Sequence, residues 1–232
     1  RALASSAGFA SLSPARRRHV ENELRDFRLG GAELPDAAKA RFKQLQEELA
    51  GLAARFQDNV LDATNAFSHV EKEPAHVAGI PADVLEAAKA LAAQGGEEGW
   101  KFTLHAPSYM PVMQYADHRP LRELLYRAFV TRAAEFGKPE WDNGPLIGQI
   151  LARREEAAKL LGFATFAEVS LATKMAGSPS EVVAFLEDLA ARAKPHAERD
   201  MAEVRVLARE ELGLPEICAW DVAWVSEKLR QK

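Results

Sequence analysis

Apolar residues recur at helical spacing along most of the chain. The clearest stripe advances in steps of three and four residues and consists of Phe42, Leu45, Leu49, Leu52, Phe56 and Val60. Charged residues, among them Lys43, Glu47 and Arg55, fall between the members of this stripe. Because residues three and four apart share one face of an α-helix, the pattern predicts an amphipathic helix that packs against other helices.

Start and stop signals bound several further helices. Ser13 and Pro14 supply an N-cap followed by a first-turn proline, and Gly30 ends the same segment. Gly137 and Gly162 likewise follow the ends of two later patterns. The helices predicted in this way cover residues 14–29, 83–93, 118–136, 145–161 and 166–174.

One long helix is predicted toward the end of the chain. Ser178 and Glu181 form a capping box with a proline at the first helical position, and an apolar stripe follows as far as Val204. Pro195 lies inside this stripe, so we expect a kink near Lys194 within a single helix.

Only one segment alternates with the period of a β-strand. Trp100, Phe102 and Leu104 are spaced by two after a glycine-rich turn, which predicts a short strand near residues 100–105. The predicted fold class is therefore mainly α, a multi-helix array with one short β element. We expect residues 1–232 to form one helical body, with a sub-boundary near the turn at 94–99.

Composition narrows the classes of function. The 232 residues are 47% hydrophobic and 28% charged with a net charge of −4, so no overall basic bias indicates nucleic acid or an anionic membrane as partner. No apolar run approaches the roughly 18 residues that span a bilayer. The single cysteine, Cys218, cannot form an internal disulfide, and this favours a reducing compartment. We expect the protein to be located in the cytoplasm.

The stretch from Thr103 to His118 concentrates residue types that can act in catalysis, with two histidines, two tyrosines and an aspartate. Pro107 and Pro111 favour extended or turn backbone in it, and Asp117 stands where it could cap a helix that begins at His118. We interpret the stretch as a strand, a turn and a helix cap.

No local motif specifies a reaction. None of the six histidines has another histidine three or four residues away, and the sequence contains no H-E-x-x-H, no G-x-S-x-G and no glycine-rich phosphate loop. Catalytic groups can still converge in space from distant positions. The residues taken alone indicate a helical domain and do not specify its function.

Several segments, taken in their order along the chain, indicate a family that no single motif identifies. Stretches such as "ENELRDFRLGGAELP" and "APSYMPVMQYADHRPLRELLYRAFVTRA" resemble the thimet oligopeptidase family of zinc metallopeptidases. The resemblance extends over almost the whole chain, through Glu21–Pro35, Asn59–Phe67, Ala106–Ala133, Trp141–Phe163, Ser170–Pro179 and Trp220–Gln231. Segments in register over more than 200 residues are more specific than any single motif.

The resemblance implies a largely helical enzyme about three times this length, with two lobes around a channel that admits short unfolded peptides. In that family an H-E-x-x-H motif and a downstream glutamate hold one zinc ion, and the motif's own glutamate activates water. The matching region lies upstream of the motif, so no catalytic or metal-binding residue is carried over to this chain. We expect a channel-wall segment that is inactive alone, with His105 and Tyr109 as candidate contacts to substrate peptide.

The ends of the sequence suggest a fragment. The chain starts without methionine, and its last segment carries an apolar stripe after Asp221, which we interpret as an N-cap. If this stripe faces an absent catalytic lobe of the same protein, it should fray or mediate self-association through Val222, Trp224, Val225 and Leu229. The alternative is a stand-alone, non-catalytic helical module that binds peptides or dimerises.

Overall fold

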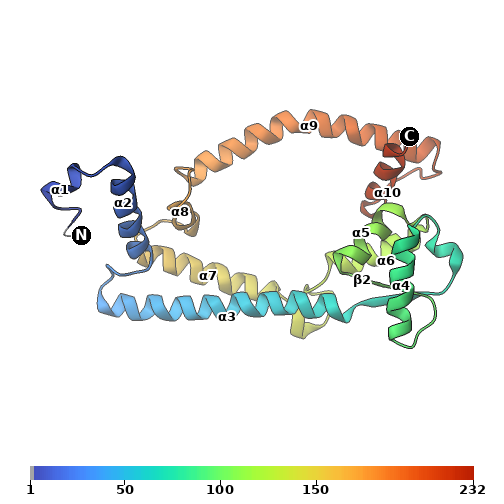
Figure 1. Ribbon diagram of the computed structural model, residues 1–232, viewed down its shortest axis with the longest axis horizontal. Coiled ribbons are helices and arrows are strands. Elements are labelled where there is room, and N and C mark those ends of the chain that lie inside the picture. Colours follow the sequence, from blue (N-terminus) through green and yellow to red (C-terminus); the bar gives the residue numbers. More distant parts are fainter. Residues whose placement is uncertain (1–2) are drawn as a thin grey trace. The chain divides into compact units, whose positions relative to one another are not determined.

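The computed structural model describes residues 3–232, which fold into two compact units (Figure 1). The first unit is made of residues up to Arg55 together with Pro145–Leu186, and the second is made of Phe56–Gly144 and Glu187–Lys232. The two longest helices, α3 (Asp36–Ala66) and α9 (Pro179–Glu210), contribute residues to both units. The predicted class, mainly α, is confirmed.

Among the described residues of the first unit, the regular elements are all helices. Besides parts of α3 and α9, it contains α1 (Ala7–Ala10), α2 (Pro14–Leu29), α7 (Gly144–Leu160) and α8 (Phe166–Leu171). Its buried core consists of Phe42 and Leu45 from α3 and Ala157 from α7, surrounded by partly buried leucines.

Ion pairs reinforce the contact between α3 and α7. Arg41 donates to both carboxylate oxygens of Glu156 at 2.6 and 2.7 Å, and Arg153 donates to Glu48 at 2.5 Å. The stripe that predicted α3 therefore packs as expected at Phe42 and Leu45.

The second unit combines helices with a two-stranded sheet. Its elements, apart from parts of α3 and α9, are β1 (Ser68–Glu71), η1 (Pro74–Val77), α4 (Ala82–Gln94), β2 (Trp100–Thr103), α5 (Ala106–Tyr115), α6 (Arg119–Val130), η2 (Pro139–Trp141) and α10 (Ala219–Arg230). The strands are antiparallel, with His69 opposite Phe102. A core that includes Phe102, Val112 and Leu125, all fully buried, joins β2, α5 and α6.

Two of the sequence predictions for this unit need correction. The strand at β2 is confirmed, but its partner β1 was missed, because Ser68–Glu71 carries no clear alternation of apolar residues. The stretch after β2 is not a turn: Ala106–Tyr115 forms α5. Pro107 occupies the first turn, where a missing N–H costs nothing, and Pro111 is accommodated inside the helix.

The caps of α6 and α10 also differ from the predictions. His118, and not Asp117, is the N-cap of α6, and the carboxylate of Asp117 accepts instead from Trp224 and Lys228 of α10. Cys218 is the N-cap of α10, and Asp221 lies at the third helical position. The predicted helix 118–136 is shorter and ends at Val130.

The final segment is packed within its own unit. α10 contacts α5 and α6 (Figure 1), Val225 is fully buried, and Trp224 is 8% exposed. Both pack on Val204 and Leu207 at the end of α9. The expectation that the stripe lacks a partner is therefore wrong for Trp224, Val225 and Leu229, because α9 and Leu212–Ile217 supply one. Self-association through Val222, Trp224, Val225 and Leu229 stays a prediction.

The signals for α9 are largely confirmed. The hydroxyl of Ser178 accepts from the backbone N–H of Glu181 at 3.1 Å, as a capping residue does. Pro195 lies inside one helix, as expected. None of the described helices is long and apolar enough to cross a membrane.

Candidate functional site

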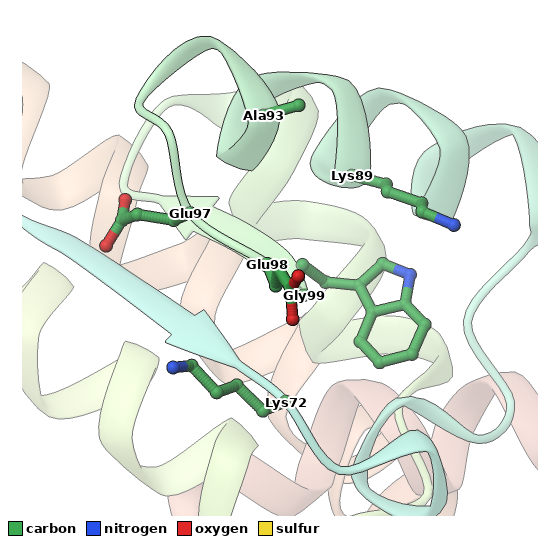
Figure 2. A pocket seen from close by; sticks show the side chains of 7 residues that line it. Lys72, Lys89, Ala93, Glu97, Glu98 and Gly99 are labelled. Atoms are coloured by element: carbon green, nitrogen blue, oxygen red, sulfur yellow. The ribbon is translucent and has the colours of Figure 1, made fainter.

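An open pocket of about 530 Å³ lies in the second unit, between α4 and the ends of the two strands (Figure 2). Its walls come from the segment after β1, from α4 and from the turn that leads into β2. The lining residues are Lys72, Lys89, Ala93, Glu97, Glu98, Gly99 and Trp100. The pocket is thus built where the predicted glycine-rich turn meets the predicted strand.

The turn owes its shape to a glycine. Gly99 has a φ of +114°, and a Cβ at this position would lie 2.3 Å from the carbonyl oxygen of Glu71. Only glycine avoids that overlap and adopts this backbone conformation without strain. The close approach lets Trp100 pair with Glu71 at the end of the sheet, beside the pocket.

The charges of the pocket are mixed. In the view of Figure 2, the ammonium groups of Lys72 and Lys89 point in opposite directions, and Glu98 lies between them. Glu97 is engaged by Lys101 at 3.0 Å. Two lysines and two glutamates can hold polar groups of a ligand, but this set contains no nucleophile with an adjacent base. The lining therefore offers hydrogen-bond donors and acceptors of both charges.

The two residues predicted to contact substrate lie at the start of α5. His105 is the N-cap of this helix and is exposed. Tyr109 is only 7% exposed and stacks on Phe129 with ring centroids 4.1 Å apart. Burial raises the pKa of Tyr109, so the phenol stays protonated at neutral pH. Neither residue lines the pocket of Figure 2, and their contact with peptide stays a prediction.

A buried ion network that the sequence did not reveal links α6 to α10. Asp221 is fully buried, and its carboxylate accepts from Arg119 at 2.7 Å, from Arg122 at 2.8 Å and from the backbone N–H of Cys218 at 2.8 Å. Arg122 is 1% exposed and also donates to the carbonyl of Ala116 at 2.7 Å. The network fixes the first turns of the two helices to each other.

Electrostatics keep this network ionised. Burial raises the pKa of Asp221, but hydrogen bonds from Arg119, Cys218 and Arg122 lower it more, so it lies below its ordinary value. Burial lowers the pKa of Arg122, and its hydrogen bond to Asp221 opposes that change. The ordinary arginine pKa is so high that the guanidinium stays charged at neutral pH. Both carboxylate oxygens of Asp221 are already hydrogen-bonded within the protein, which is typical of a structural contact.

Within residues 3–232, no group of three or more histidine, cysteine, aspartate or glutamate side chains is arranged to hold a metal ion.

Comparison with known proteins decides the family. Residues 112–232 match the model of the family described as Peptidase family M3. The chain belongs to peptidase family M3. The family resemblance inferred from the order of sequence segments is thereby confirmed.

Relatives of this M3 chain are similar along nearly all of it. Oligopeptidase A of Haemophilus influenzae is 44% identical over 232 residues, which are 99% of this chain and 34% of the relative. A probable cytosolic oligopeptidase A of Arabidopsis thaliana is 37% identical over 241 residues, which cover 100% of this chain and 34% of the relative. A dipeptidyl carboxypeptidase of Salmonella typhimurium is 30% identical over 207 residues, which cover 89% of this chain and 30% of the relative.

The M3 chain spans about a third of the length of these relatives. It is similar to peptidases throughout, yet the zinc motif expected for such enzymes is absent from its 232 residues. The family membership therefore describes a segment of a peptidase.

Proposed function

We propose that this chain is a segment of a zinc-dependent oligopeptidase that hydrolyses short unfolded peptides, and that it supplies scaffold and channel wall without catalytic groups. The observation that carries the proposal is the match to M3 peptidases along 99% of the chain but only 34% of the relative, with no H-E-x-x-H in the sequence. One zinc ion then belongs to the remainder of the parent protein.

An exposed apolar face supports a partner for this segment. Four side chains of α9, all between 51% and 65% exposed, follow one another within two turns: Val183, Phe185, Leu186 and Leu189. Clustered exposed apolar side chains of this size mark an interaction surface. The length of the relatives implies that the parent has about twice as many further residues as this chain. We propose that this remainder, the catalytic lobe of the same chain, covers the apolar face of α9.

Further parts of the proposal concern the fragment itself. His105 and Tyr109 are proposed contacts to peptide, with exposed His105 the more accessible of the two. Residues 1–232 are proposed to act as one helical part of the parent, with a sub-boundary near 94–99. A cytoplasmic location is supported by the cytosolic relative from Arabidopsis thaliana.

Reconstitution tests the proposal. The parent reading frame is first followed past Lys232, where we expect a coding sequence with H-E-x-x-H. The remainder of the parent is then produced separately and mixed with this chain, and turnover of a fluorogenic short peptide is measured. We expect turnover to require both parts and to fall with Phe185→Ser, whereas exposed Leu3→Ser serves as a control outside the α9 face. A stop codon directly after Lys232 would contradict the proposal.

A second function, a stand-alone helical module, is favoured by one observation. The terminal helix α10 buries Trp224 and Val225 against its own unit, as in a self-contained domain. Such a module would bind peptides or dimerise without catalysis. The stop codon that contradicts the first proposal would support this one.

A further inference from the structure

Two stacked histidines and a glutamate lie where β1, η1 and α6 meet in the second unit. His76 of η1 stacks on His118, the N-cap of α6, with ring centroids 3.7 Å apart and planes inclined by 16°. Oε2 of Glu71 lies 3.2 Å from Nδ1 of His76 and 3.6 Å from Nε2 of His69. The segments that carry these rings are distant in sequence, and the stack is a tertiary contact between them.

Glu71 is a fixed anion beside this stack. Its Oε1 accepts from the backbone N–H groups of Lys72 at 2.9 Å and Glu73 at 3.1 Å. Burial raises the pKa of Glu71, but these two bonds and those from His76 and His69 lower it more, so the result lies below the ordinary value. At neutral pH the carboxylate is charged and can compensate one protonated imidazole.

The charges facing His118 disfavour a proton on it. Burial lowers the pKa of His118, His76 across the stack and Arg122 of α6 lower it too, and only Glu71 of β1 acts in the opposite direction. Glu71 makes its close contact with His76, at 3.2 Å. If both stacked rings carried a proton, two cations would lie face to face, with the buried guanidinium of Arg122 nearby.

The stack holds a short, tightly fitted segment. Val77 and Ile80, which follow His76, are 4% and 6% exposed in the core, and the carbonyl of Ala78 accepts from the backbone N–H of Asp117 at 2.9 Å. The residue beside His118 is therefore bonded directly to the segment that carries His76. A loss of the stack acts on residues 76–80 first.

We propose that the His76–His118 stack is an acid-sensitive latch, which holds η1 against the start of α6 while His118 is neutral and loosens η1 when both rings carry a proton. The sign follows from linkage. Because the pKa of His118 is lower in the closed state, the opened state binds the proton more readily. The contribution of His118 to the closed state is full above the ordinary histidine value of about 6.5 and is lost as pH falls from there through the lower closed-state value.

NMR titration of the histidine rings tests the latch on the intact chain. His76→Gln keeps a planar side chain at the stack but cannot become cationic, and His196→Gln replaces a histidine of α9 outside the cluster. We expect the midpoint of His118 to rise in His76→Gln and to stay unchanged in His196→Gln. A His118 midpoint that does not rise in His76→Gln would overturn the proposal.

Amide exchange gives a second, independent measure. Protection factors of residues 76–80, which correct for the intrinsic pH dependence of exchange, are compared between about pH 7.5 and about pH 5. We expect a loss of about tenfold at these residues, a much smaller loss in α4, and a reduced loss at residues 76–80 in His76→Gln, where burial and Arg122 still disfavour a proton on His118. If His76→Gln does not fold, His76→Asn takes its place in both measurements, with the same expected results for His118. Equal protection at both pH values in the unaltered chain would overturn the latch.

Discussion

At the scale of single residues, Asp221 links two helices of the second unit. It accepts hydrogen bonds from two arginines and one backbone N–H while fully buried, so its removal would leave the buried guanidinium of Arg122 without a carboxylate partner. The side chain lies at the third position of α10 and bonds back to the N-cap residue. One carboxylate thus stabilises the start of α10 and its attachment to α6.

We predict that Asp221→Asn lowers the free energy of unfolding by about 3–5 kcal/mol, because Arg122 would stay buried and charged without its partner. Urea denaturation followed by circular dichroism measures the change. The control is Glu123→Gln, which removes an exposed ion pair with Arg127 and should cost less than about 0.5 kcal/mol. Equal losses in the two variants would show that the network contributes no more than a surface pair.

The same residue predicts an acid limit. Because the pKa of Asp221 is lowered in the folded state, the unfolded chain binds its proton more readily, and the contribution to stability is full above the ordinary value of 3.8. It is lost as pH falls through the lower folded value. We expect the urea concentration at the unfolding midpoint of the unaltered chain to decrease once the pH is lowered below about 4. The decrease should be shallower in Asp221→Asn. Parallel curves for the two proteins would contradict this role.

At the scale of elements, the junction between η1 and α4 depends on close backbone packing. Gly79 has a φ of +85°, and a Cβ there would lie 2.2 Å from the carbonyl oxygen of Tyr115 at the end of α5. Gly96, in the turn after α4, has a φ of +71° and open space around it. The two glycines share the backbone requirement and differ in the space available.

This difference predicts unequal effects of the same substitution. Gly96→Ala should cost only the strain of a left-handed alanine, about 1–2 kcal/mol. Gly79→Ala should cost about 1–3 kcal/mol more, because α5 or the η1 segment must shift to admit the methyl group. Thermal and urea unfolding of both variants measure the difference. Similar stabilities would mean that the contact with Tyr115 relaxes freely.

Elements with strong local signals were predictable from the sequence. Ser13 and Ser178 accept from the backbone N–H groups of the helices that follow them, and the stripe through Phe42 and Leu45 is buried as its spacing indicated. These features depend on residues within one or two turns. Strand β2 was found for the same reason, through its own alternation.

Elements that depend on distant partners were not predictable in this way. β1 is held as a strand by pairing with β2, about thirty residues later, and its own four residues give no pattern. Cys218 is an unusual N-cap, so Asp221 was assigned to the cap and the ion network was missed. The His76–His118 contact likewise joins segments whose spacing contains no motif.

At the scale of the whole molecule, the chain is a member of family M3 that spans about a third of the length of its relatives. The chain matches oligopeptidase A of Haemophilus influenzae along 99% of its own residues and 34% of the relative. Within residues 3–232, no cluster of side chains is arranged to hold a metal ion, and four apolar side chains of α9 are largely exposed. They motivate the proposed scaffold role, in which the chemistry resides in another part of the parent.

The most direct test of this role is the zinc content and peptidase activity of the purified chain alone. Metal analysis after dialysis is paired with hydrolysis of a fluorogenic short peptide, with and without a chelator, and the full-length parent serves as positive control. We predict no stoichiometric zinc and no chelator-sensitive turnover for the chain, but one zinc and turnover for the parent. One tightly held zinc per chain with chelator-sensitive turnover would contradict the scaffold role.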